Sequence, residues 1–250
     1  MSITIARSVG GATLAAGGLL LGTALAAHAG AEPVASPSGP ELVCRESRCV
    51  PSDLAGVLGW NADAAGSALD VSYTLLPGWS ATETDSGDVI LHLPEWVAPG
   101  SFGVPAVTIF ADPLAPRQPC GDTALPKAGT DVEALHHALA QHPGLEVTVD
   151  EPVEVGGLSG RHLDLTLADG WTDTCPGAAG EPAVAYLIDD HGTHLHRTVT
   201  ADTPVRLFLL EAGDRTVAVE VAVPASRVDF EQYVEVAQQM IDTLDFDVAP

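Results

Sequence analysis

Three histidines in the C-terminal half of the chain form the group whose residue types and spacing best suit metal chemistry. His194 and His196 are two positions apart, so their side chains project from the same face of an extended strand. His191 precedes them, and a turn at Gly192 could fold it back towards both. Three imidazoles suit a borderline divalent metal such as zinc. The alternative is a polar hairpin with solvated histidines. We favour this alternative and expect no cofactor.

The sequence lacks the motifs of other common chemistries. Ser159 lies in Gly157-Leu158-Ser159-Gly160-Arg161, which is not the Gly-x-Ser-x-Gly turn of a hydrolase nucleophile. There is no His-Glu-x-x-His helix, no glycine-rich phosphate loop and no EF-hand spacing. We therefore assign no catalytic residue and expect a protein that is not an enzyme.

The N-terminus has the pattern of a secretory signal peptide. Arg7 precedes an uncharged run from Val9 to Ala26, and Ala27-His28-Ala29 supplies the small-x-small motif that signal peptidase recognises. We predict cleavage after Ala29. The alternative is a permanent anchor, because the run approaches the ~20 residues of a spanning helix. A lipid anchor is not expected, because the first cysteine, Cys44, does not directly follow the run.

The chain has four cysteines, Cys44, Cys49, Cys120 and Cys175. In an exported protein four cysteines predict two disulfides, which can pair in three ways. We favour the local pairing, Cys44 with Cys49 and Cys120 with Cys175. A structural zinc site is the weaker alternative, because the C-x4-C spacing has no second cysteine or histidine pair nearby.

Composition and charge exclude two classes of protein. The sequence has 10 Lys and Arg against 34 Asp and Glu, a net charge of -24. Nucleic-acid-binding proteins need clustered basic residues to neutralise phosphates, so this class is excluded. Hydrophobic residues make up 46% of the chain and charged residues 18%, which indicates a packed core rather than a disordered chain. The acidity favours basic partners or cations.

Short apolar runs separated by turn residues predict a series of β-strands from Leu69 onward. The expected strands are 71–75, 89–93, 104–111, 145–149, 152–155, 162–167, 183–188, 194–199, 205–211 and 216–223. The run from Gly156 to Gly160 predicts a hairpin turn.

Two helices are expected. The capping sequence Thr130-Asp131-Val132-Glu133 begins the first, and His142-Pro143-Gly144 ends it. Ser226 is the expected cap of the second, whose apolar stripe is Phe230, Val234, Ala237, Ile241 and Leu244.

Strands in hairpins, with one central and one terminal helix, predict an α+β fold in which a mainly antiparallel sheet is packed with helices. We divide the chain into a signal peptide (1–29), a linker with a small cysteine-containing segment (30–68) and one α+β domain (69–250).

Several motifs resemble those of a known group of proteins. They are Tyr73-Thr74-Leu75-Leu76-Pro77-Gly78-Trp79, Ala111-Asp112-Pro113, Val155-Gly156-Gly157-Leu158-Ser159-Gly160 and Ile241-Asp242-Thr243-Leu244-Asp245-Phe246. Over roughly residues 69–246 the chain is similar to LpqN-type exported actinobacterial proteins of unknown function, and more distantly to the α/β/α sandwich of PsbP, an extrinsic photosystem subunit. The resemblance implies this fold and a role in binding or scaffolding, and it implies no catalytic residues. The chain lacks the lipobox of the lipoprotein members.

Taken together, these observations predict a secreted, non-enzymatic binding or scaffolding protein of the cell envelope. The alternative is a metal-binding protein or metal-dependent enzyme centred on His191, His194 and His196. The expected partner is an envelope protein or a small ligand. We expect no nucleic-acid partner and no stable membrane insertion after cleavage.

Overall fold

The computed structural model describes most of the chain from residue 42 onward. The described residues are 42–45, 48–51, 56–60, 69–84, 87–93, 105–121, 123–125, 131–176, 178, 180–188, 196–224 and 228–248. Within 42–60, and at Leu69 and His196, only the backbone is described. All of these residues belong to one compact unit, Ser38–Pro250.

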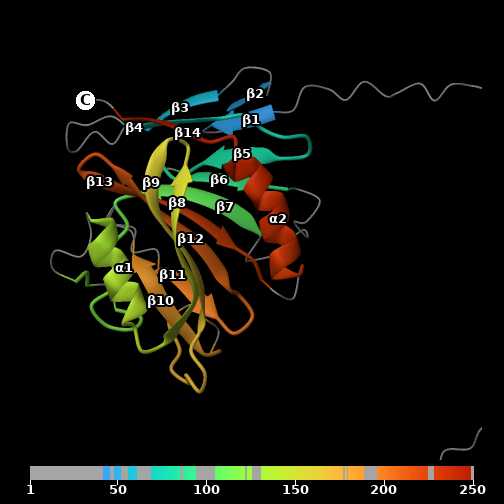
Figure 1. Ribbon diagram of the computed structural model, residues 1–250. Helices are drawn as coiled ribbons and strands as arrows, with labels where there is room; N and C mark the ends of the chain where they lie inside the picture. Colours follow the sequence, from blue (N-terminus) through green and yellow to red (C-terminus); the bar gives the residue numbers. More distant parts are fainter. Residues whose placement is uncertain are drawn as a thin grey trace, which may run out of the picture. The chain divides into compact units, whose positions relative to one another are not determined.

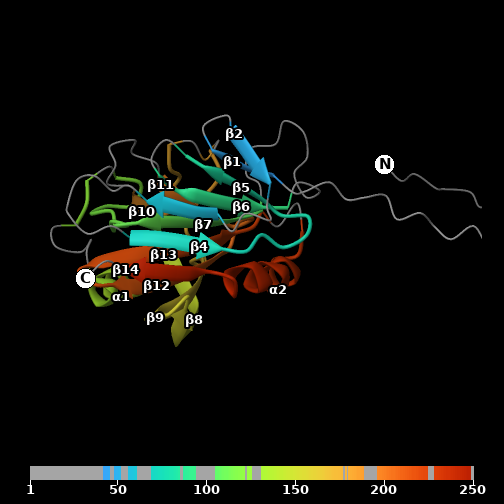
Figure 2. The ribbon, with the colours of Figure 1, turned by 90° about the horizontal axis from the view of Figure 1, so that it is seen from above.

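A nine-stranded sheet lies at the centre of this unit. Its strands, in order across the sheet, are β2 (Arg48–Pro51), β1 (Leu42–Arg45), β5 (Ser80–Glu83), β6 (Val89–His92), β7 (Ala106–Ala111), β13 (Arg215–Ala222), β12 (Val205–Ala212), β9 (Leu158–Leu167) and β8 (Leu145–Val155). Figure 2 shows this order from β1 and β2 at one edge to β9 and β8 at the other. Within this sheet β1 pairs with β5 in parallel, and the remaining pairs are antiparallel.

Two smaller sheets and two helices accompany the large sheet. A three-stranded sheet consists of β14 (Asp245–Val248), β4 (Leu69–Tyr73) and β3 (Gly56–Trp60), and a hairpin consists of β10 (Ala183–Ile188) and β11 (His196–Thr200). The helices are α1 (Val132–Ala140) and α2 (Phe230–Ile241). Figures 1 and 2 both show α1 and the β10–β11 hairpin on one side of the large sheet and α2 on the other.

The strand registers place one row of residues across seven strands of the large sheet. Residues directly opposite each other on neighbouring strands point to the same face. From β8 to β5 the row consists of Asp150, Leu163, Leu207, Glu220, Thr108, Ile90 and Thr82. His136 of α1 is hydrogen-bonded to the first of these residues, and Tyr186 of β10 donates a hydrogen bond to Glu220. We call the face that carries this row the α1 face, and the opposite face the α2 face.

The α2 face is apolar and carries much of the core. Its residues include Ile109 and Val219, both fully buried, and Phe208, which is 2% exposed. Helix α2 contributes Tyr233, Ala237 and Met240, all with no exposed surface. Trp79 packs against Tyr233 with 6.4 Å between ring centres. Burial of these side chains away from water is the main force that holds α2 on the sheet.

The N-terminal cap residues of both helices differ from those expected. Asp131 caps α1 by accepting a hydrogen bond from the Glu133 amide at 2.9 Å, one residue after the expected Thr130. Asp229 caps α2 by accepting from the Gln232 amide at 3.1 Å, so α2 begins three residues later than expected from Ser226, which lies outside the described residues. Both serine and aspartate satisfy free amides at a helix start, so sequence preference alone does not decide between them.

The buried stripe of α2 also differs from the expected one. Val234, Ala237 and Ile241 are buried as predicted, and Tyr233 and Met240 are buried beside them. The predicted Leu244 lies past the end of the helix but is buried. Phe230 is only partly buried and packs on the edge of the core.

The hairpin between β8 and β9 turns in two residues, Gly156 and Gly157, with φ of 56° and 82°. Two positive φ values are the requirement of a tight hairpin turn, which explains the glycine pair. The expected turn reached Gly160, but this residue lies inside β9, where a Cβ atom would lie 1.9 Å from the Leu209 carbonyl oxygen. Gly160 is therefore needed for close strand packing and not for the turn.

The α+β fold with a mainly antiparallel sheet is confirmed. Strands β1, β2, β3, β5 and β14 were not expected; β1 to β3 fall within residues 30–68 and pair with one another or with β5 and β4. Among the described residues no helix is long and apolar enough to cross a membrane.

Candidate ligand-binding site

A hollow of about 380 Å³ opens on the α1 face at the end of the row that lies on β5, β6 and β7. Its walls are Thr82, Ile90, His92, Ala106, Thr108, Arg197, Glu220 and Ala222. We call it the polar hollow. Its volume lies at the small end of the range for small-molecule sites.

The sheet registers explain why these side chains meet. Thr82, Ile90, Thr108 and Glu220 are the last four members of the row. His92 lies two residues after Ile90 on the same strand and therefore points to the same face. Ala106 stands opposite Ala222 in the neighbouring β7–β13 pair. The two alanines are small, and they leave space beside the bulkier members of the row.

An ion-pair network fixes one wall of the hollow. Arg197 of β11 contacts the Asp88 carboxylate at 3.1 Å and the Glu220 carboxylate at 3.4 Å. Its guanidinium carbon also lies 4.5 Å from the ring centre of Phe110. Asp88 is 4% exposed and Glu220 3% exposed, so each carboxylate needs these partners. The network ties the β10–β11 hairpin to the large sheet.

Tyr186, which does not itself line the polar hollow, donates its hydroxyl proton to the Glu220 carboxylate. Burial raises the pKa of Tyr186 well above its usual value, and the negative charge of Glu220 raises it further. The phenol therefore stays protonated and remains a donor. Glu220 is thus held from two sides, by Tyr186 and by Arg197.

Besides the exposed Thr82 at the rim, two polar side chains in the hollow have no hydrogen-bond partner within the part of the chain that the structure describes. Thr108 is 4% exposed, yet no hydrogen bond to a described residue engages its hydroxyl. His92 also lines the hollow without such a bond, and burial lowers its pKa, which favours the neutral imidazole. Both groups line the hollow, so they are available to a ligand or to water.

The arrangement suits binding. A fixed carboxylate, a neutral imidazole and a hydroxyl present donors and acceptors at the wall, and Ile90 with the two alanines presents apolar surface. Few convergent polar groups in a partly apolar concavity are the usual composition of a small-ligand site.

A second hollow, of about 460 Å³, lies between α1 and the loop 115–125. Its side chains Arg117, Gln118, His137 and Gln141 are exposed. His142, which is half-buried, and the buried Tyr186 also line it, and the Nε2 atom of His142 has no hydrogen-bond partner among the described residues. The polar hollow differs because two of its polar residues, Thr108 and Glu220, are buried and project from paired central strands. We therefore regard the polar hollow as the stronger candidate.

Of the three histidines singled out from the sequence, most lie outside the residues that the structure describes. His191 and His194 lie outside the described residues, and His196 is described only as a backbone position in β11, next to Arg197. Among the described residues no group of three or more His, Cys, Asp or Glu could hold a metal ion. The metal hypothesis at these three histidines therefore stays a prediction.

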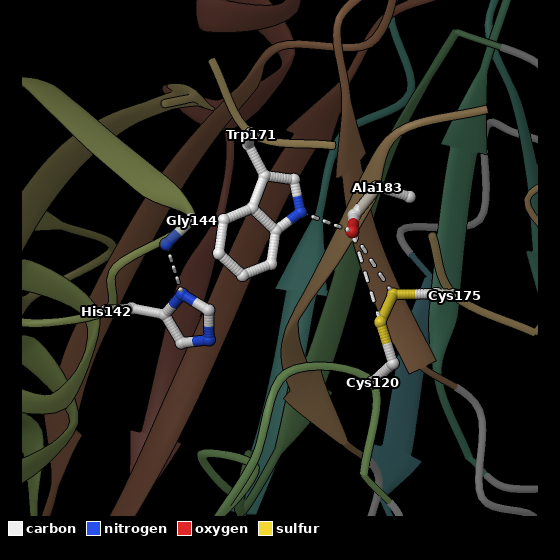
Figure 3. Close-up of a disulfide and its surroundings, with 6 residues drawn as sticks. All are labelled: Cys120, His142, Gly144, Trp171, Cys175 and Ala183. Carbon is white, nitrogen blue, oxygen red and sulfur yellow. Dashed lines mark hydrogen bonds between the residues drawn. A yellow bond between two sulfur atoms is a disulfide. The ribbon is translucent and has the colours of Figure 1, made fainter. Parts of the chain in front are cut away.

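The disulfide between Cys120 and Cys175 is confirmed, with 5.1 Å between the Cα atoms (Figure 3). It joins the loop before α1 to the segment that leads into β10. Both sulfurs lie close to the Ala183 carbonyl oxygen, at 3.9 and 3.5 Å. Disulfide sulfur carries no proton, so of the three contacts to this oxygen in Figure 3 only that from Trp171 Nε1, at 3.0 Å, is a hydrogen bond.

The other cysteine pair is described at the level of the backbone. Cys44 of β1 stands directly opposite Cys49 of β2 in their antiparallel pairing. A bond between Cys44 and Cys49 stays a prediction.

His142 lies two residues after the end of α1. Its Nδ1 accepts a hydrogen bond from the Gly144 amide at 3.1 Å, and its ring lies beside Trp171 (Figure 3). Burial lowers its pKa. These contacts give His142 a structural role at the end of α1.

Two Asp-centred clusters hold neighbouring strands elsewhere in the sheet. On the α2 face Asp164 accepts two hydrogen bonds from Arg206, both at 2.7 Å, and lies 3.0 Å from His162 Nε2. Burial acts to raise the pKa of Asp164, but the bonds from Arg206 and His162 outweigh it and lower the pKa to about 2. On the α1 face Asp150 joins His136 and Arg161. In each cluster the carboxylate is held by an arginine and a histidine, which is typical of a structural role.

Comparison with known proteins gives limited information. No family model matches the chain, and no curated protein matches it. Among solved structures the chain is similar to the solution structure of cyanobacterial PsbP (CyanoP) from Synechocystis sp. PCC 6803. The identity is 9% and the TM-score 0.35, with 72% of this chain and 86% of that chain covered. A similarity of this size carries no inference about function, and membership of the LpqN-type group stays a prediction.

Proposed function

We propose that the chain is an exported, non-enzymatic binding protein of the cell envelope, and that the polar hollow is its ligand-binding site. The observation that carries the proposal is Thr108, a residue that is 4% exposed, lines a 380 Å³ hollow and has a hydroxyl without a hydrogen-bond partner among the described residues. A core position on a central strand normally carries an apolar side chain, so a threonine at this position suggests a use for its hydroxyl. A ligand in the hollow can form a hydrogen bond with this hydroxyl.

The rigidity of the site supports binding. Glu220 and Thr108 project from paired central strands, and the ion pairs of Arg197 hold the adjoining hairpin. Sites on strands keep their geometry better than sites on loops, so less conformational entropy is lost when the ligand binds. The signal-peptide pattern supports the location.

The proposal can be tested by filling the hollow. Thr82 is exposed at its rim, so Thr82→Trp places an indole in the hollow without disturbing the core. Ser159, an exposed strand residue outside the hollow, provides the matched control Ser159→Trp. Ligand-observed NMR with a mixture of small amines, carboxylates, alcohols and sugars should find binders to the wild type. These binders should be lost in Thr82→Trp and retained in Ser159→Trp.

Two results would refute the proposal. The first is that no compound in the mixture binds the wild-type protein. The second is that binders are found but keep their affinity in Thr82→Trp, which would place their site elsewhere.

A further inference from the structure

Arg117 differs from the other arginines whose side chains the structure describes. A carboxylate contacts each of those others, which are Arg161, Arg197, Arg206 and Arg215. Arg117 is exposed, and no carboxylate of a described residue pairs with it. Acidic partners are abundant, because the chain has 34 Asp and Glu against 10 Lys and Arg. The guanidinium of Arg117 is therefore available to an anion from outside the chain.

Arg117 lines the second hollow, of about 460 Å³, which lies between α1 and the loop 115–125. We call it the α1 hollow. None of the residues that line it is Asp or Glu, although the whole chain has a net charge of -24. Its wall therefore brings a positive charge without a negative one, so an anion in the α1 hollow meets no carboxylate there.

His142 supplies a second donor to the α1 hollow. The Gly144 amide donates to its Nδ1 at 3.1 Å, so this nitrogen carries no proton. Burial lowers the pKa of His142, which favours the neutral ring, and the proton of that ring then lies on Nε2. Nε2 is buried without a partner among the described residues, and Figure 3 shows it on the side of the ring turned away from Gly144. Because His142 lines the α1 hollow, this N–H is available to a ligand or to water.

The rest of the wall is largely apolar. Ala115 and Leu139 line it and are 2% and 1% exposed, and Leu125 is partly buried. The buried Tyr186 also lines the α1 hollow, and because its hydroxyl is bonded to Glu220 it adds aromatic rather than polar surface. A matching ligand has one negatively charged acceptor group and an apolar body. Among such groups, a carboxylate suits the planar guanidinium, which can donate two parallel hydrogen bonds to it.

We propose that the α1 hollow binds a small organic carboxylate, whose charge pairs with Arg117 and whose apolar body packs against Leu125, Leu139 and Tyr186. The Nε2–H of His142 is a further donor to the carboxylate. This site is separate from the polar hollow, and it does not depend on the function proposed for the polar hollow.

The test uses the mature protein and three probes of nearly the same shape, sodium benzoate, benzamide and benzamidinium chloride. In ¹⁵N NMR titrations at pH 7 and constant ionic strength, benzoate should give saturable shifts that centre on Arg117, His137 and His142. Benzamide and benzamidinium should bind there at least fivefold more weakly. The negative charge of the protein repels benzoate and attracts benzamidinium, so a preference for benzoate cannot come from non-specific attraction.

Inorganic phosphate, which is an anion without an apolar body, should also bind at least fivefold more weakly than benzoate. Equal binding of phosphate would overturn the proposal, because the site would then respond to charge alone. Equal binding of benzamide would overturn it as well, because Arg117 would then contribute nothing.

Substitutions locate the binding. Arg117→Gln removes the charge at an exposed residue, and Gln239→Glu makes the same change in net charge on α2, on the other side of the large sheet. His142→Asn keeps an acceptor for the Gly144 amide and removes the Nε2–H. Arg117→Gln and His142→Asn should each weaken benzoate binding about fivefold, and Gln239→Glu should leave it unchanged. Unchanged binding in either of the first two variants would overturn the proposal. If His142→Asn fails to fold, Arg117→Gln decides the matter.

The two hollows are distinguished by Thr82→Trp, which fills the polar hollow and should leave benzoate binding unchanged. Carboxylates that bind the α1 hollow in the ligand screen are recognised by their loss in Arg117→Gln, and the refutation based on Thr82→Trp concerns the remaining binders. If benzoate binding is lost in Thr82→Trp and kept in Arg117→Gln, the carboxylate binds in the polar hollow and the present proposal fails. If benzoate binds as predicted and no other ligand depends on Thr82, the α1 hollow is a ligand site and the function proposed for the polar hollow fails.

Discussion

The Asp164 cluster should make the free energy of unfolding depend on pH, and the substitution Asp164→Asn should remove this part of the pH dependence. The Asp164 side chain is 8% exposed, and Arg206 and His162 lower its pKa to about 2 from an ordinary value of 3.8. Because the pKa is lower in the folded protein, the charged form stabilises the fold above pH 4. This stabilisation is lost as the pH falls towards 2.

The size of the effect follows from the shift. A change of about 1.8 pKa units corresponds to about 2.5 kcal/mol at neutral pH. Linkage leaves about 0.4 kcal/mol of this at pH 2. Asp164→Asn, which has no charge to lose, should therefore be destabilised relative to the wild type by about 2 kcal/mol more at pH 5 than at pH 2. The comparison starts at pH 5 because ordinary histidines are already protonated there.

Urea unfolding followed by tryptophan fluorescence measures this difference, since Trp79 is buried. The comparison of two proteins at each pH cancels the effect of the many other carboxylates. Asp169→Asn changes an exposed aspartate and should give a difference that is independent of pH. A pH-independent difference for Asp164→Asn as well would refute the assignment of a charge-stabilised cluster.

Four further predictions follow from the fold and from the sequence. Ile241→Ala should cost about 2 to 5 kcal/mol and lower Tm by roughly 5 to 15 °C, whereas the exposed Gln239→Ala should barely change it in calorimetry; equal effects would mean that α2 is not docked as described. Tyr186→Phe removes a donor from a buried carboxylate and should cost about 1.5 to 3 kcal/mol in urea unfolding; no loss would contradict the ion network. Intact mass of the secreted protein should show a chain that begins at Gly30 and takes up no alkylating agent without reductant; a retained leader or a free thiol would contradict this. Micromolar zinc should leave the Tm of chelator-treated protein unchanged. If a zinc site existed, a zinc concentration of 100 times its dissociation constant would add about 2.7 kcal/mol of stability. A saturable rise in Tm that is lost in His194→Ala would favour the metal alternative.

Elements with a clear local signal in the sequence, an apolar run or a helix cap, were predicted correctly. The strand 183–188 and the first helix were found from apolar runs and caps, and the structure has them at Ala183–Ile188 and Val132–Ala140. The short strands β1, β5 and β14 have four residues each, which gives little periodic signal, and their order depends on pairing with other strands.

The candidate site could not be found in this way, because its residues come from four separate parts of the chain. Glu220 had a weak signal as a lone acid within the apolar strand Val217–Val221, on a strand buried on both faces. Nothing in the sequence connects it to Arg197 or Asp88. Their contact depends on the sheet register and on the placement of the β10–β11 hairpin, which no local spacing determines.

The most direct test of the polar hollow as a ligand site is a ¹⁵N NMR titration of the mature protein. Butylammonium, butyrate and 1-butanol are added separately, and amide shifts are mapped onto the chain. We predict saturable shifts that centre on Thr82, His92 and Thr108 for at least one of these probes. The absence of saturable shifts at these residues for all three probes, or shifts confined to exposed acidic residues of β8, would contradict the account.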